Sequence, residues 1–210
     1  MRALIFCWSE SSAVPVSIKD DDIVICADSG YLYAERIGIK PDILIGDYDS
    51  LEKEKFEAAD CEKICLPSEK NDTDTHFAVE YALKKGCSEI IICGGLGGAR
   101  LDHMLANIST LKHIYECSKK GFITDGKTQV YYLPAHSRTL IPYNPECGYI
   151  SVFPFSGMAE VTIKGLKYEI NDYLLKNDYP IGVSNEFIEN RDGIIYAEKG
   201  DAVVFLVNKL

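Results

Sequence analysis

The chain has 210 residues, of which 47% are hydrophobic and 26% charged, as in a globular protein with one large or two small domains. Its formal net charge of -10 argues against a nucleic-acid partner, which needs a basic surface. No run approaches the roughly 20 apolar residues of a membrane span, and the first residues lack a signal-peptide pattern, so no membrane partner is expected. The eight cysteines show no metal-ligand spacing, which favours reduced thiols and a cytoplasmic location.

The first half of the chain alternates predicted strands with predicted helices. Short apolar runs predict strands at 3–8, 23–27, 43–45, 64–66 and 90–93, and helical spacing predicts helices at 31–37, 52–59, 74–85 and 102–119. Lys84-Lys85-Gly86 and Lys119-Lys120-Gly121 are expected to end the last two helices, with cations at the negative end of the dipole. This alternation predicts a Rossmann-like α/β domain with a mainly parallel sheet covered by helices on both faces.

After about residue 125 the helical period disappears. Short extended runs at 129–133, 139–141, 149–153, 159–163, 194–197 and 202–207 alternate with turn formers such as Ser156-Gly157 and Lys199-Gly200-Asp201. This pattern predicts an antiparallel β-sandwich or a small barrel. We therefore predict an α/β domain at 1–128 and a β-sandwich domain at 129–210.

Two carboxylates directly follow the buried strand at 43–45. Gly46 ends the apolar run, and Asp47 and Asp49 come next at positions i and i+2, where an extended chain points both side chains the same way. Like charges held so close favour a cation between them, and Mg²⁺, which prefers oxygen ligands, commonly brings a phosphate with it. A loop with two solvated or capping aspartates is the alternative.

Three further clusters follow strands or precede helices of the first domain, where an open α/β sheet has its ligand crevice. Asp28 follows the second strand and is either a ligand-binding residue or a helix N-cap. Thr73 and Asp74 lie in the acidic stretch 69–75, which suits either helix capping or a ligand at the positive end of a helix.

The third cluster is a glycine-rich loop at 94–98, followed by Arg100, Asp102 and His103. Its glycines allow backbone amides to approach phosphate oxygens, and the Arg100 fork can bridge two such oxygens. It fits neither of the common glycine-rich phosphate-loop patterns. His103 is as readily a packing residue as a catalytic one.

These motifs, in order along the chain, resemble those of the thiamine pyrophosphokinase family. The resemblance rests on Ala27-Asp28-Ser29-Gly30, Pro41-Asp42, Gly46-Asp47-Tyr48-Asp49-Ser50, Thr73-Asp74, the glycine-rich loop with Arg100-Leu101-Asp102-His103, Gly165-Leu166-Lys167-Tyr168 and Val183-Ser184-Asn185-Glu186. It implies a catalytic α/β domain that binds ATP and Mg²⁺, followed by a thiamine-binding β-sandwich. It also implies a homodimer with active sites at the subunit interface. The implied reaction moves a pyrophosphoryl group from ATP to the thiamine hydroxyl and releases AMP.

The resemblance also implies roles for individual residues. Asp47, Asp49 and Asp74 are expected to bind Mg²⁺ and, with Arg100 and Asp102, to form the catalytic set. ATP is expected to contact Asp28, Thr73, Gly97, Gly98, Arg100 and His103, and thiamine to contact Asp74, Ser184 and Asn185. By our own interpretation of the residues, Asp102 either positions Arg100 or binds a ligand, and Asp74 is a candidate for the carboxylate that accepts the hydroxyl proton. Ser184 and Asn185 equally suit a turn between strands.

Three positions depart from the family pattern: Ser29 replaces a glycine, Asn71 replaces an acid, and Ala99 lengthens the loop before Arg100. Three other functions are compatible with the acidic cluster. They are a diphosphokinase acting on a pterin alcohol, a metal-dependent phosphohydrolase and a nucleotide-binding regulator without turnover. The Ser184-Asn185 motif favours thiamine over a pterin.

Overall fold

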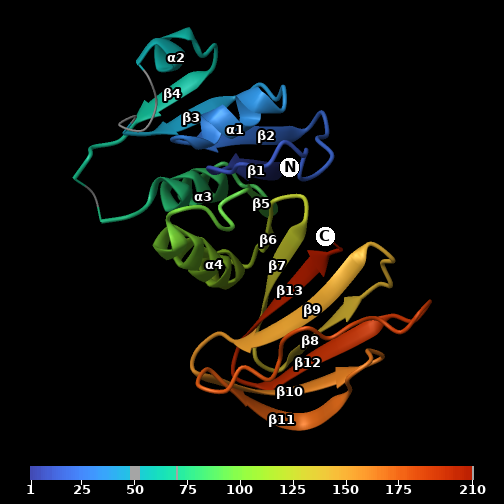
Figure 1. Cartoon of the computed structure of the whole chain (residues 1–210). Coiled ribbons are helices and arrows are strands. Elements are labelled where there is room, and N and C mark those ends of the chain that lie inside the picture. Colours follow the sequence, from blue (N-terminus) through green and yellow to red (C-terminus); the bar gives the residue numbers. More distant parts are fainter. Residues whose placement is uncertain (48–52, 70, 210) are drawn as a thin grey trace. The chain divides into compact units, whose positions relative to one another are not determined.

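The computed structural model describes residues 1–47, 53–69 and 71–209, and they form two compact units, Met1–Gly126 and Lys127–Leu210 (Figure 1). Unit 1 contains α1–α4 and β1–β6, and unit 2 contains β7–β13. The prediction of a parallel α/β part followed by an antiparallel β part is confirmed. None of the helices in the described part of the chain is both long enough and apolar enough to cross a membrane.

The sheet of unit 1 is parallel, with the strand order β4-β3-β2-β1-β5-β6. Its strands are β1 (Arg2–Phe6), β2 (Asp22–Ala27), β3 (Ile43–Gly46), β4 (Glu62–Cys65), β5 (Glu89–Cys93) and β6 (Lys120–Thr124). The chain builds outward from β1 to β4 and then returns to place β5 against the other side of β1. This reversal is a topological switch point, beside which open α/β sheets bind ligands at the carboxyl ends of their strands.

Helices cover both faces of this sheet. The helices are α1 (Gly30–Arg36), α2 (Lys53–Ala58), α3 (Asp74–Lys84) and α4 (Leu101–Glu116). Leu4 and Phe6 of β1, every second residue, pack with Tyr33 and Ala34 of α1 in one core cluster. Helix α3 contacts β1, β2 and β3 but contributes nothing to that cluster, so it covers the opposite face, where Ala3 and Ile5 point.

Unit 2 is a β-sandwich. One sheet has the order β7-β13-β9 and the other β11-β10-β12-β8, and all their pairings are antiparallel. The strands are β7 (Thr128–Leu133), β8 (Ser137–Ile141), β9 (Cys147–Pro154), β10 (Met158–Lys164), β11 (Ile170–Lys176), β12 (Gly193–Lys199) and β13 (Ala202–Asn208). Buried residues of both sheets, among them Ile150, Val161 and Ile195, share one core.

The prediction for the segment after α4 is wrong. The helix ends at Glu116 rather than at 119, because Ser118 takes a left-handed conformation with φ 59. The Lys119-Lys120-Gly121 signal therefore does not end the helix, and Lys120–Thr124 forms β6 beside β5.

Strand β11 was also not predicted. It lies at the edge of its sheet, and Leu175 is its single fully buried side chain. A left-handed residue, Asp172 with φ 44, and a register shift interrupt its pairing with β10. An exposed edge strand with such an irregularity has no alternation of apolar and polar residues from which it can be recognised.

Candidate active site

A cavity of about 700 Å³ opens in unit 1 at the carboxyl ends of β1, β2, β3 and β5. Of the predicted site residues in this unit, it is lined by Asp28, Asp47, Thr73, Asp74, Gly97, Arg100 and His103. Gly98 and Asp102 lie next to lining residues, and Asp49 lies outside the described residues. Ser29, Asn71 and Ala99, the three departures from the family pattern, also line this cavity.

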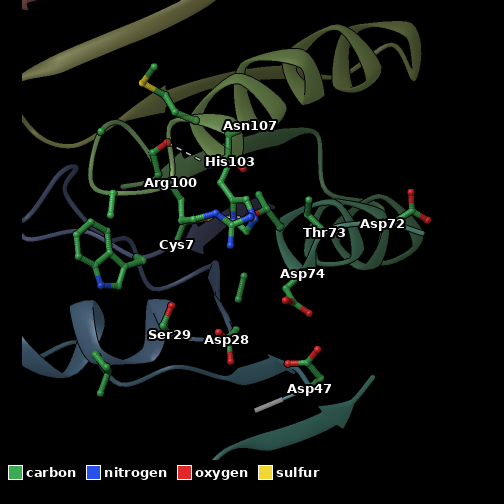
Figure 2. Close-up of a pocket in the computed structure, with 18 of the residues that line it drawn as sticks. Cys7, Asp28, Ser29, Asp47, Asp72, Thr73, Asp74, Arg100, His103 and Asn107 are labelled. Carbon is green, nitrogen blue, oxygen red and sulfur yellow. Dashed lines mark hydrogen bonds between the residues drawn. The ribbon is translucent and has the colours of Figure 1, made fainter. Parts of the chain in front are cut away.

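Three aspartates from separate elements face the same space. Asp28 follows β2, Asp47 follows β3 and Asp74 begins α3, and their carboxylates point toward one another (Figure 2). One carboxylate oxygen of Asp28 and one of Asp74 are shielded from solvent. Asp72 lies just before α3 and its carboxylate points away from the group. Clustered, partly shielded carboxylates repel one another, so the arrangement favours a bound cation.

The backbone holds Asp28 in place at the end of β2. Its amide donates to Ile45 O at 2.8 Å, and its φ of 46 turns the chain out of the sheet. The N-cap position of α1 belongs to Ser29 rather than to Asp28. Residue 30 has to be glycine because α1 begins directly against β1. A Cβ at this position would lie 1.9 Å from Phe6 O. The Asp-Ser-Gly sequence thus combines a cavity carboxylate with a close contact between helix and strand.

The start of α3 combines capping with the cavity wall. The Thr73 hydroxyl accepts a hydrogen bond from His76 N at 3.2 Å, so Thr73 is the N-cap. Thr75 is buried, and its hydroxyl oxygen lies 3.2 Å from the sulfur of Cys7. Asp74 is therefore presented from a helix start fixed on both sides, at the positive end of the α3 dipole.

The glycine-rich loop forms the opposite wall. Asn107 of α4 donates from Nδ2 to Gly95 O at 3.1 Å and fastens the loop to the helix behind it. Gly98 has φ 82 and lies under the Trp8 ring, where a Cβ would come within 2.3 Å of Trp8 Cζ3. Gly97 has open space around it, so its backbone is accessible to a ligand.

Arg100 carries the positive charge of the wall. Its Nε donates to Asp102 Oδ1 at 3.0 Å, its Nη2 donates to Asp102 Oδ2 at 2.7 Å, and Nη2 also lies 2.6 Å from His103 Nε2. The hydrogen bonds from Arg100 lower the pKa of Asp102 to about 2, so Asp102 is ionised at neutral pH. Asp102 does not line the cavity, and its contact is with Arg100, as expected of a positioning residue.

Charge in the cavity is strongly unbalanced. Among its described lining residues are four aspartates and a single arginine, Arg100. Carboxylate oxygens are the ligands that Mg²⁺ prefers, whereas the fork of an arginine matches phosphate oxygens. The cavity therefore suits a phosphate-bearing ligand together with a divalent cation.

Sequence reasoning missed several lining residues, among them Cys7, Trp8 and Asn107. Burial raises the pKa of the Cys7 thiol to about 11, so Cys7 remains a neutral thiol rather than a nucleophile. The predicted strand at 3–8 included Cys7 and Trp8, whereas β1 ends at Phe6, so both residues lie just after the strand at the switch point. Asn107, in the middle of α4, gave no local signal.

Ser184 and Asn185 belong to unit 2, and their predicted contact with thiamine stays a prediction. Ser184 is exposed and has a left-handed φ of 61. Asn185 is 6% exposed, and its side chain accepts from Tyr168 N at 3.0 Å and donates to Tyr168 O at 2.8 Å. The Asn185 amide thus joins two loops of the sandwich.

Comparison with known proteins gives matches over both units. The family model described as "Thiamin pyrophosphokinase, catalytic domain" matches residues 15–123, and "Thiamin pyrophosphokinase, vitamin B1 binding domain" matches residues 138–200. A thiamine pyrophosphokinase of Bacillus subtilis is 30% identical over 178 residues, which cover 83% of this chain and 82% of the relative.

Solved structures are similar over the whole chain. A crystal structure of thiamine pyrophosphokinase from Bacillus subtilis has a TM-score of 0.85 and 25% identity, covering 100% of this chain and 99% of its own. A thiamin pyrophosphokinase family protein from Enterococcus faecalis has a TM-score of 0.84 and 24% identity, covering 100% of both chains, which supports the fold.

Proposed function

The chain belongs to the thiamine pyrophosphokinase family, and we propose that its cavity transfers a pyrophosphoryl group from ATP to the hydroxyl of thiamine. The observation that carries this proposal is the convergence of Asp28, Asp47 and Asp74 opposite Arg100 and the glycine-rich loop. Phosphoryl transfer depends mainly on positioning and charge stabilisation, and this set of residues supplies both.

The proposed reaction is a substitution at the β-phosphorus of ATP. The thiamine hydroxyl oxygen forms a bond to that phosphorus, and the bond from the phosphorus to the oxygen bridging the α- and β-phosphates breaks. AMP leaves with that oxygen, and the hydroxyl proton passes to a base. We propose that a cavity carboxylate that does not bind the metal accepts this proton, because a metal-bound carboxylate is a weak base.

We propose that Asp47 and Asp74 hold Mg²⁺, with Asp28 beside them, because all three offer hard oxygen donors in one shielded space. Asp49 is assigned to the same set from its sequence position alone. When bound, Mg²⁺ supplies positive charge that offsets the charge of the phosphates. The residues of the chain orient the nucleotide: Arg100 bridges phosphate oxygens, His103 lies beside it, and the Gly97 and Gly98 amides line the phosphate path.

Thiamine is assigned to Asp74 and to Ser184 with Asn185 of unit 2. We propose a homodimer whose subunits meet at the thiamine sites, supported by exposed apolar side chains on unit 2, among them Tyr149, Tyr168, Tyr179, Ile181 and Val183. Light scattering of the purified chain tests the dimer, and a monomer would exclude it. A cytoplasmic location is supported by eight free cysteines, as is usual in reducing compartments.

The reaction is tested by following AMP and the second product by mass, with Mg-ATP and either thiamine or a pterin alcohol. We expect AMP and thiamine diphosphate in equal amounts, and only when thiamine is present. Asp47→Asn should lower kcat on the order of 10²-fold or more. Asp21→Asn, an exposed aspartate outside the cavity, should leave kcat unchanged. Turnover with the pterin alone, or ATP hydrolysis without transfer, would overturn the assignment.

A further inference from the structure

A second group of metal-ligating side chains lies between α3 and α4, apart from the residues that line the cavity. His76 and Glu80 are one turn apart on α3, so their side chains share a face of that helix. His113 comes from the facing helix, α4, which packs against α3.

The three side chains already converge. His113 Nε2 lies 2.5 Å from Glu80 Oε1, and the rings of His76 and His113 have centroids 5.0 Å apart at an angle of 44°. One ligand atom from each of the three residues lies within 4.8 Å of the other two. All three are half-buried, so they are partly preorganised and still reachable from solvent.

The types of ligand atom in this group indicate which metal ion it would bind. Two imidazole nitrogens and one carboxylate oxygen suit a late first-row divalent cation, whereas Mg²⁺ prefers oxygen ligands alone. With Zn–ligand distances of about 2.0–2.1 Å, tetrahedral donors lie about 3.3 Å apart. The Nε2–Oε1 contact of 2.5 Å is shorter than this value, and all three ligand atoms lie within 4.8 Å of one another, so small rotations of half-exposed side chains complete the geometry.

We propose that His76, Glu80 and His113 form a Zn²⁺ site that links α3 to α4. When the ion binds, Glu80 and His113 each coordinate it, and this replaces their direct contact with each other. A fourth position remains for water or for the Cys117 thiol, which lies 3.9 Å from His113 Nε2. Because α3 begins at Asp74 and α4 begins directly after Arg100, the bound ion fixes the spacing of the two helices that border the cavity.

The test is a Zn²⁺ titration of the full-length, metal-stripped protein in excess Mg²⁺, which is added so that the oxygen-rich cavity does not compete for Zn²⁺. Calorimetry measures affinity and stoichiometry, and the visible absorption of bound Co²⁺ reports nitrogen ligation. We expect one ion per chain. His76→Gln and His113→Gln should each lower the affinity at least about tenfold and remove the Co²⁺ absorption band. His136→Asn is the matched control, because His136 is a turn residue of unit 2 with φ 57, a conformation that Asn tolerates.

A second measurement separates metal loss from misfolding. Zn²⁺ should raise the Tm of the wild-type protein by mass action but should not raise the Tm of His113→Gln. In the presence of a chelator, the wild-type protein and His113→Gln should unfold at similar temperatures. Cys117→Ser should keep Zn²⁺ binding. The proposal is overturned if His113→Gln binds Zn²⁺ as tightly as wild type. It is also overturned if Mg²⁺ displaces the ion completely, or if only Cys117→Ser loses it.

Discussion

Arg100 lines the cavity and forms a bidentate pair with Asp102, and we predict that Asp102 acts on the reaction only through Arg100. Arg100→Lys keeps the charge but removes the fork that joins Nε to Oδ1 at 3.0 Å and Nη2 to Oδ2 at 2.7 Å. Loss of one preorganised phosphate-binding group should lower kcat/KM for ATP on the order of 10²-fold. Asp102→Asn keeps Arg100 but weakens its orientation, and should lower kcat/KM about tenfold.

The variant that combines Arg100→Lys with Asp102→Asn tests whether Asp102 acts only through Arg100. If Asp102 works through Arg100, the double variant should resemble Arg100→Lys alone, because the fork it would orient is already absent. The assay is AMP release at varied ATP concentration, with thiamine saturating. Both side chains are about two-thirds exposed, so unfolding should be almost unchanged in all three variants and folding will not confound the rates. A double variant reduced by the product of the two single effects, about 10³-fold, would refute the reasoning.

Three further predictions concern packing and thiol chemistry. Gly98→Ala should lower the free energy of unfolding about 1–3 kcal/mol more than Gly97→Ala in urea, because both positions have positive φ but only a Cβ at Gly98 meets Trp8; equal losses would exclude the clash. Iodoacetamide at about pH 8 should modify the exposed thiols and spare Cys7, whose burial holds its pKa at about 11 so that the reactive thiolate is scarce. Peptide mass mapping checks this, and fast labelling of Cys7 in the folded protein would contradict it. Asn185→Ala should cost about 1–3 kcal/mol in unfolding free energy, because the amide is buried and bonded on two sides. Unchanged stability in urea would contradict this.

Sequence alone determined the fold class and most of the elements. The apolar runs of β1, β2, β3 and β5 and the helical period of α3 are local signals, set by which residues neighbour one another along the chain. The ends of parallel strands meet at one edge of a sheet, so carboxylates after β2 and β3 were expected near each other. Asp28 and Asp47 indeed line one cavity with Asp74.

Tertiary structure alone decided the features without a local signal. Strand β11 exposes nearly all its side chains, and Ser118 ends α4 by a left-handed turn that composition did not indicate. Asn107 lies in mid-helix, and only the packing of α4 places it against Gly95. His113 lies 33 residues from Glu80, and they meet only because α3 and α4 pack together. Such contacts depend on the order of strands and the docking of helices, which the periodicity of a single segment does not encode.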